Sequence, residues 1–378
     1  MFSKKEKPLP TPVLTANKVT NINSDRNGNA IASINKPGVT IGHNVVWNPE
    51  KLPNAHLVAI GGSGSGKTQT LKAIAYDITN KYPDTKVILI DFHGDQEIKG
   101  ETCYPLNMAS NNGINPLVIN KDPEGGGVNL QAILVATTLK NSLKLGVNQE
   151  GLMLEIIGEC YEKKGIFQSD MATWDKQPPN FTDIRSEIEK RIEAGCRESQ
   201  KLKLKLAATF QYGVFSKPQP DLSPKLIRID MHKLPPEIAS IAAESLASQL
   251  MNQHRLMGEA KSKMPRTYLF IDEAKEMPKK QGSACDRILA DGRKYGLAMV
   301  LASQSERHLS KDVIGNSATK IVLPVDQTEV KKVASKFRFG ESKVAELEPL
   351  TALCRFGKDA KFVRIIPYYQ KIKEIEKT

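Results

Sequence analysis

The sequence has 378 residues, enough for one large domain or two modest ones. Forty per cent of the residues are apolar and 25% are charged, as in ordinary soluble proteins, and no apolar run approaches the roughly eighteen residues of a membrane span. The 54 basic and 42 acidic residues leave a net charge of +12, which suits a polyanionic partner such as nucleic acid or an acidic membrane surface. A generally basic surface is the alternative.

The start of the chain and its cysteines favour a cytoplasmic protein. The first residues include several lysines but no apolar stretch behind them, which is not the pattern of a signal peptide. The five cysteines are scattered and form no C-x-x-C pair, so neither a disulfide framework nor a zinc site is predicted. We therefore expect a cytoplasmic protein with no integral membrane segment.

The amino-terminal part leads from an irregular segment into a nucleotide-binding pattern. Residues 1–36 contain Pro, Asn, Ser, Thr and Lys with little periodicity, which predicts an extended or weakly ordered arm. Short strands are predicted at 39–42 and 44–48, before an apolar strand at 56–60. A helix follows over 68–81, because apolar residues recur there at i, i+3, i+4 and i+7.

Between the strand and the helix lies G-G-S-G-S-G-K-T, which fits the G-x-x-x-x-G-K-[ST] phosphate loop in its required context. Small residues let the backbone N–H groups turn toward an anion, and the helix dipole points at the same place. Lys67 is predicted to reach the β- and γ-phosphates, and the Thr68 hydroxyl to hold Mg²⁺. A flexible linker is the alternative, but the flanking strand and helix favour ATP binding. The predicted binding residues are Gly61, Gly62, Ser63, Gly64, Ser65, Gly66, Lys67, Thr68 and Gln69.

A second apolar strand at 86–90 predicts a strand–helix–strand unit and a parallel sheet. Residues 100–127 are rich in Asn, Gly and Pro and predict an irregular loop. Residues 128–215 then form a mostly helical insertion between two core segments, 37–127 and 216–378. Its Lys-Leu-Lys-Leu repeat alternates like a strand, but the helical surroundings favour a helix. Helices are predicted in this insertion near 130–144, 150–164, 182–194 and 199–212.

After the insertion, apolar strands and amphipathic helices alternate again, which predicts an α/β fold with a mainly parallel sheet covered by helices. The last predicted element is a hairpin that joins 351–356 to 362–366 through Gly357-Lys-Asp-Ala. Before it, strands are predicted at 225–230, 267–271, 297–302 and 320–323, and helices at 236–257, 283–294 and 327–336.

Two carboxylates follow the strand at 267–271. Asp272 is predicted to bind Mg²⁺ beside Thr68, through water, as the second metal contact of this class of site. Glu273 is placed to orient and deprotonate the attacking water. Acids that simply end a buried strand are the alternative, and the phosphate loop some 200 residues earlier favours the catalytic interpretation.

Three further residues are candidates for the reaction. Gln304 follows the next strand, and its amide can sense the γ-phosphate or align water. Arg293 closes the helix before that strand and can stabilise transition-state charge on a neighbouring subunit's nucleotide. Arg287 is the reserve candidate for this arginine. The alternatives are a loop glutamine and a helix-terminal charge that interacts with the dipole.

At this point a family resemblance becomes specific. The matching segments are the approach G-H-N-V-V-W with the phosphate loop, D-F-H-G-D at 91–95, D-E-A at 272–274, R-K-Y-G-L running into A-S-Q, and N-S-A-T-K-I-V-L at 316–323. Over roughly residues 40–330 they resemble the FtsK–HerA superfamily of ring-forming DNA-pumping ATPases, especially its HerA-like branch. That branch also includes the ATPases of conjugative secretion systems.

The resemblance implies a RecA-like P-loop NTPase core and a homo-oligomer, a hexameric ring with nucleotide at its subunit interfaces. It also implies that Lys67, Thr68, Asp272, Glu273 and Gln304 act in cis and Arg293 in trans. About forty residues precede the core, too few for the β-barrel that many HerA-like members carry.

The leading hypothesis is therefore an ATP- and Mg²⁺-dependent motor that translocates double-stranded DNA. Two alternatives remain open. The first is an ATPase that energises the transfer of DNA or protein by a secretion system. The second is an ATP-switched scaffold for a nuclease or defence effector.

Overall fold

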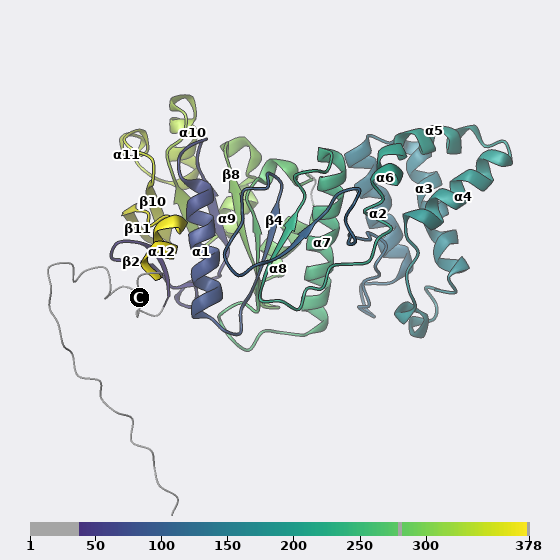
Figure 1. Ribbon diagram of the computed structural model, residues 1–378, viewed down its shortest axis with the longest axis horizontal. Coiled ribbons are helices and arrows are strands. Elements are labelled where there is room, and N and C mark those ends of the chain that lie inside the picture. Colours follow the sequence, from purple (N-terminus) through teal and green to yellow (C-terminus); the bar gives the residue numbers. More distant parts are fainter. Residues whose placement is uncertain (1–37, 279–281, 376–378) are drawn as a thin grey trace, which may run out of the picture. The chain divides into compact units, whose positions relative to one another are not determined.

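The computed structural model describes residues 38–278 and 282–375, and the arm predicted over 1–36 lies outside them. Its centre is a nine-stranded sheet with the order β11-β10-β9-β3-β8-β7-β4-β6-β5, beside a two-stranded sheet of β1 and β2 (Figure 1). The strands are β1 (Val39–Gly42), β2 (Val45–Trp47), β3 (Leu57–Ile60), β4 (Lys86–Asp91), β5 (Thr102–Pro105), β6 (Leu226–Asp230), β7 (Thr267–Ile271), β8 (Leu297–Ser303), β9 (Thr319–Val322), β10 (Thr351–Phe356) and β11 (Asp359–Arg364).

The middle of the large sheet is parallel. β3 pairs in parallel with β8 and β9, and β7 pairs in parallel with β8 and β4. The register places Ile60 opposite Ser303 and Ile271 opposite Leu301. The segments that follow β3, β8 and β7 therefore leave the sheet at the same edge, called here the carboxyl edge. The opposite edge, where these strands begin, is the amino edge.

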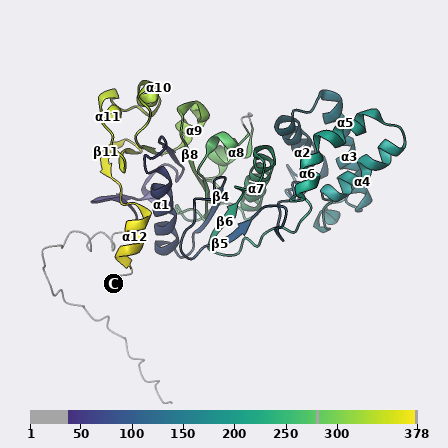
Figure 2. The ribbon, with the colours of Figure 1, turned by 45° about the horizontal axis from the view of Figure 1, so that its top comes forward.

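Helices cover both faces of the sheet, and alternate strand residues point to the two layers. One layer holds α1 (Lys67–Lys81) and α12 (Tyr368–Ile375), which lie side by side in Figure 2. The other layer holds α7 (Pro236–Leu256), α8 (Ala284–Asp291) and α10 (Gln327–Phe337). This arrangement confirms the predicted α/β architecture with a mainly parallel sheet.

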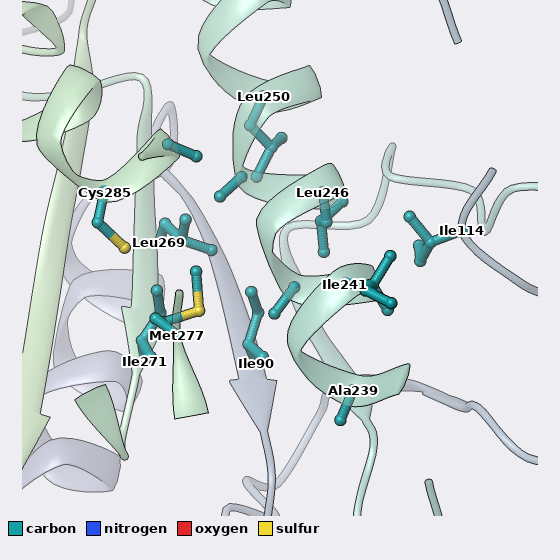
Figure 3. Packing of buried hydrophobic residues seen from close by; sticks show 14 of the residues in the cluster. Ile90, Ile114, Ala239, Ile241, Leu246, Leu250, Leu269, Ile271, Met277 and Cys285 are labelled. Carbon is teal, nitrogen blue, oxygen red and sulfur yellow. The ribbon is translucent and has the colours of Figure 1, made fainter. Parts of the chain in front are cut away.

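Helix α7 is apolar on two sides because it is covered on two sides. Leu250 lies on the side of the helix that faces the strand residue Leu269, as Figure 3 shows. Ile241, about two and a half turns earlier, lies beside Ile114 on the other side of the helix. α7 also contacts α2, so it joins the sheet to the helical insertion.

The insertion consists of helices, as the sequence predicted (Figure 1). Among its described residues the only β-pairing is an isolated bridge between Phe167 and Asp170. The Lys-Leu-Lys-Leu segment is helical, and a break at Leu206 divides the last predicted helix in two. The division of the chain into a core and an insertion subdomain stays a prediction. The insertion helices are α2 (Val128–Leu143), α3 (Val147–Lys163), α4 (Phe181–Glu193), α5 (Arg197–Lys205) and α6 (Ala207–Tyr212).

Other elements differ from the prediction. β5 lies within the predicted irregular loop, where a four-residue strand with half-exposed side chains leaves no apolar run to recognise. The carboxy-terminal hairpin turns at Gly357 and Lys358 alone, and Gly357 has a φ of +61°. Two short helices, α9 (Lys311–Asn316) and α11 (Glu341–Ala345), were not predicted, and neither was α12.

Candidate nucleotide-binding site

The phosphate loop joins β3 to α1 at the carboxyl edge. Gly64 and Gly66 have φ values of +74° and +94°, in the left-handed region that favours glycine. No side chain caps the first turn of α1, so its backbone N–H groups are available to an anion. A Cβ on Gly66 would lie 2.5 Å from a methyl carbon of Leu350, so a larger residue would not fit at this position. The loop thus has the backbone of an anion-binding turn.

Lys67 and Asp272 meet at this loop. The buried Lys67 ammonium forms an ion pair with the Asp272 carboxylate and donates a 3.2 Å hydrogen bond to the Asp272 carbonyl oxygen. The two residues are 205 positions apart in the sequence, and the sheet order brings them together. The predicted phosphate-binding cation and the predicted metal-binding carboxylate therefore share one place.

Thr68 adds a hydroxyl to the same place. Its Oγ1 lies 3.4 Å from Oδ2 of Asp272 and 3.4 Å from Oδ2 of Asp95. These groups fit Mg²⁺, which takes oxygen ligands and is held in such sites by few protein groups together with substrate phosphates. Among the described residues no cluster of three or more His, Cys, Asp and Glu side chains is arranged to hold a metal. A magnesium site completed by nucleotide oxygens does not need one.

Gln96 and Asp91 belong to the site, although the sequence did not identify them as site residues. Nε2 of the buried Gln96 donates to Oδ2 of Asp272. Asp91 fixes the loop that carries Gln96 by accepting from three backbone amides, those of His93 at 3.1 Å, Gly94 at 2.7 Å and Gln96 at 3.1 Å. Arg228 donates to Asp91 at 3.2 Å. The segment 91–95 stood out only as part of the family resemblance, and a glutamine after it carries no spacing signal.

Glu273 is fully buried at the end of β7. Within the described part of the chain, no group donates a hydrogen bond to either of its carboxylate oxygens. A buried carboxylate without donors is costly, so it needs a reason beyond folding. This position is compatible with the predicted general base, and the role itself stays a prediction.

Gln304 follows β8, and Gln69 lies in the first turn of α1. Gln304 is exposed and directly follows Ser303, the last residue of β8. The Ser303 carbonyl oxygen accepts a 3.1 Å hydrogen bond from the Gly61 backbone N–H in the loop. Gln69 accepts from the backbone N–H of Tyr369 at 3.4 Å, so α12 borders the first turn of α1. Both residues lie at the carboxyl edge, and their roles stay predictions.

Arg293 lies at the amino edge, away from the phosphate loop of its own chain. The preceding helix, α8, ends at Asp291, earlier than predicted, because the chain turns at Gly292. The turn is tight: a Cβ on Gly292 would lie 2.4 Å from the Ile288 carbonyl oxygen. Arg293 is therefore an exposed turn residue rather than the end of a helix. β8 follows with seven residues, a length of about 20 Å. Arg293 thus cannot contact phosphates bound at its own loop.

Arg287, the reserve candidate, is engaged within its own chain. Its Nη2 donates a 2.9 Å hydrogen bond to the Ser248 hydroxyl on α7, and burial lowers the pKa of its guanidinium. The exposed Arg293 is therefore better placed than Arg287 to reach a second copy.

Comparisons with known proteins agree with this geometry. The solved structure of VirB4 of Thermoanaerobacter pseudethanolicus matches 87% of this chain and 96% of its own, with a TM-score of 0.72 and 17% identity. The plasmid coupling protein TrwB in complex with ADP and Mg²⁺ matches 88% of this chain and 89% of its own, with a TM-score of 0.59 and 18% identity. This chain has a RecA-like P-loop ATPase fold.

The sequence matches point the same way. Residues 235–354 match the family described as the type IV secretion-system coupling protein DNA-binding domain. A probable helicase of Methanocaldococcus jannaschii is 22% identical over 351 residues, which are 81% of this chain. The chain spans 64% of the length of that relative. These matches confirm the predicted resemblance to the FtsK–HerA superfamily on the side of its secretion ATPases.

The RecA-like strand order explains the arrangement of the site. β8 lies between β3, which carries the phosphate loop, and β7, which ends at Asp272. Gln304 therefore leaves the sheet between the phosphate loop and the two carboxylates. The predicted cis residues come from three adjacent strands, whereas Arg293 lies at the other end of β8.

Proposed function

We propose that this chain hydrolyses ATP with Mg²⁺ and, as a subunit of a hexameric ring, uses the hydrolysis to translocate double-stranded DNA. The observation that carries the ATPase proposal is the meeting of Lys67, Thr68 and Asp272 at the phosphate loop, next to the buried Glu273. Two solved structures of one similar protein support it: TrwB has been solved with ADP and Mg²⁺ and with a non-hydrolysable ATP analogue.

In the proposed reaction, the loop N–H groups and Lys67 hold the phosphates, and Thr68 and Asp272 hold Mg²⁺. The ion would neutralise charge on the β- and γ-phosphate oxygens. Gln96 keeps Asp272 oriented through its amide hydrogen bond. Glu273 removes a proton from the attacking water, and Gln304 senses the γ-phosphate.

Arg293 would act on a neighbour's nucleotide. It lines a cleft of about 690 Å³ at the amino edge together with Lys51, Lys261 and Lys263, and with Lys294, which pairs with Glu259 at 3.2 Å. A head-to-tail ring brings the amino edge of one subunit to the carboxyl edge of the next, where the triphosphate is bound. Cations at one edge and carboxylates with phosphates at the other are complementary in charge, which supports this arrangement.

DNA as the cargo is supported by the net charge of +12 and by the DNA-binding description of the matching family. Such a motor grips phosphates without reading sequence. The test is ATPase activity with and without double-stranded DNA at low salt. We expect DNA to stimulate the ATPase activity. If DNA neither stimulates hydrolysis nor is retained by the protein, the result contradicts a DNA motor.

A role in secretion is the second candidate, because the matching family is described as a coupling protein of type IV secretion systems and VirB4 shares the fold. The cargo would then be protein or a protein–DNA complex, delivered to membrane-embedded partners. Co-purification with such partners would favour this candidate. Among the described helices, none is both long and apolar enough to cross a bilayer. We propose a cytoplasmic location in either case.

A further inference from the structure

A second cleft is lined by none of the residues assigned above. It has a volume of about 680 Å³ and is bordered by the segment 338–348 and by the β10–β11 hairpin. Figure 1 shows α11, which belongs to that segment, near the hairpin. We call it the hairpin cleft. The strand register places Arg364 opposite Thr351 and Phe362 opposite Leu353, so these side chains share the cleft-facing side of the hairpin.

The hairpin cleft is rich in positive charge. Five of its lining residues are cations and two are acids, and no ion pair among the described residues neutralises any of these seven groups. Lys320 on β9 lies directly opposite Arg355 on β10, a like-charge pair that destabilises a sheet. Burial, followed by the charges of Arg355 and Arg338, lowers the pKa of Lys320. The lining cations are Arg338, Lys343, Arg355, Lys361 and Arg364, and the acids are Glu346 and Glu348.

Aromatic rings accompany these cations. Phe362 is 58% exposed on the edge strand β11, where neighbouring apolar residues do not cover it. The Arg355 guanidinium lies 4.9 Å from the centre of the Phe339 ring. Such planar groups offer faces on which an unstacked base can lie, with cations beside them for the phosphates.

We propose that the hairpin cleft binds single-stranded nucleic acid, with Phe362 stacking on a base and Arg364 and Arg338 contacting phosphates. A duplex fits this chemistry less well because its base faces are hidden inside the stack. A neutral or apolar peptide would leave the positive charges unpaired.

The hairpin cleft is separate from the nucleotide site but next to it. Leu350 lies between Glu348 and Thr351 of the cleft, and its backbone N–H donates a 3.1 Å hydrogen bond to the Ser65 carbonyl oxygen in the phosphate loop. The Leu350 side chain fills the space beside Gly66. The proposal goes beyond the proposed function, since binding here requires neither hydrolysis nor a ring.

The test is fluorescence anisotropy with a labelled twelve-nucleotide oligothymidylate and no ATP, so a failure of the ATPase proposal does not affect its result. Phe362→Ala should weaken binding about tenfold or more, because stacking contributes to affinity without reading sequence. The double variant of Arg338→Ala with Arg364→Ala should make the negative slope of log affinity against log salt shallower by about 1.4, that is, by about 0.7 for each lost phosphate contact.

Matched controls lie in the helical insertion. Phe167→Ala removes an aromatic ring that is 44% exposed, and Arg197→Ala removes an exposed arginine. Both should leave affinity and salt slope unchanged. Thermal unfolding of each variant checks that the fold is kept, which is expected because Phe362 and Arg364 are exposed.

Three results would overturn the proposal. The first is oligonucleotide binding that is as tight in folded Phe362→Ala and in the arginine double variant as in the natural chain. The second is equal binding of a duplex of the same length with no dependence on Phe362. The third is loss of self-association in these variants with unchanged oligonucleotide binding, which would assign the cleft to a second copy of the chain.

Discussion

The two edges of the central sheet differ in how complete they are. At the carboxyl edge Lys67, Thr68 and Gln96 each already contact Asp272, although they come from distant parts of the sequence. At the amino edge Arg293 is exposed, in a cleft whose other cations also face outward. The first edge is a preassembled half-site, and in the proposed ring the second edge would complete the half-site of a neighbouring subunit. The predictions below test this difference.

The largest expected effect is at the amino edge. Arg293→Ala should lower kcat for ATP hydrolysis by about 10³- to 10⁵-fold, as loss of a trans arginine does. ATP binding, measured with a fluorescent analogue, should change little, because the arginine does not belong to the phosphate loop of its own chain. Lys311→Ala, an exposed cation at the other edge, is the control. Full activity of Arg293→Ala would place the charge-stabilising group elsewhere.

The next effect is at the carboxyl edge. Glu273→Gln should keep ATP bound and lower hydrolysis by about 10²- to 10⁴-fold, since only the proton acceptor is lost. Single-turnover measurements separate the two quantities. Loss of ATP binding instead would show that the buried Glu273 supports the loop rather than the chemistry.

A smaller effect is expected at Gln96, which acts through Asp272. Gln96→Leu removes the amide donor at nearly constant size, so the Mg²⁺ concentration for half-maximal ATPase activity should rise by about 10- to 100-fold. Saturating Mg²⁺ should restore most of kcat. Gln253→Leu on the exposed end of α7 is the control. A defect that no Mg²⁺ concentration restores would argue against a positioning role.

The smallest effect concerns stability at the amino edge. His56 is buried before β3 and accepts a 3.1 Å hydrogen bond from the Met299 backbone N–H, and burial lowers its pKa to about 4. Above pH 6.5 the folded and unfolded chains both hold it neutral. As the pH falls toward 4, only the unfolded chain takes up the proton, so stability is lost.

Between pH 7 and pH 5 this difference should cost about 2 kcal/mol of unfolding free energy. Urea unfolding at the two pH values measures it. The pKa of the buried His254 is lowered in the same direction, so His56→Asn should reduce the pH dependence without removing it. An unchanged dependence in His56→Asn would show that His56 does not contribute.

The sequence predicted most of the sheet because its strands are continuous apolar runs, and it predicted the phosphate loop because glycine spacing and context are both specific. Asp272 and Glu273 were found for the same reason, at the end of such a run. Gln96 was not found, because its role depends on a loop fixed by Asp91 and Arg228, and Arg228 comes from β6. β5 and α12 were missed because a strand of four residues and a helix of eight are too short to give a clear pattern.

The hairpin cleft shows the same limit. Its cations and aromatic rings are spread over residues 338–364 with no motif, and strand register brings them onto one face. Arg355 and Lys320 come together only through the pairing of β10 with β9. Such a cluster becomes visible only when the fold is known.

The most direct test of the two-edge account is a mixing experiment. Lys67→Ala disables the carboxyl-edge half and Arg293→Ala the amino-edge half, so each protein alone should be nearly inactive. In a mixed head-to-tail ring, about one quarter of the interfaces would join an intact loop to an intact arginine. The account predicts that mixing equal amounts restores measurable DNA-stimulated ATPase activity. No recovery, in mixtures shown by light scattering to contain both chains in one assembly, would contradict it.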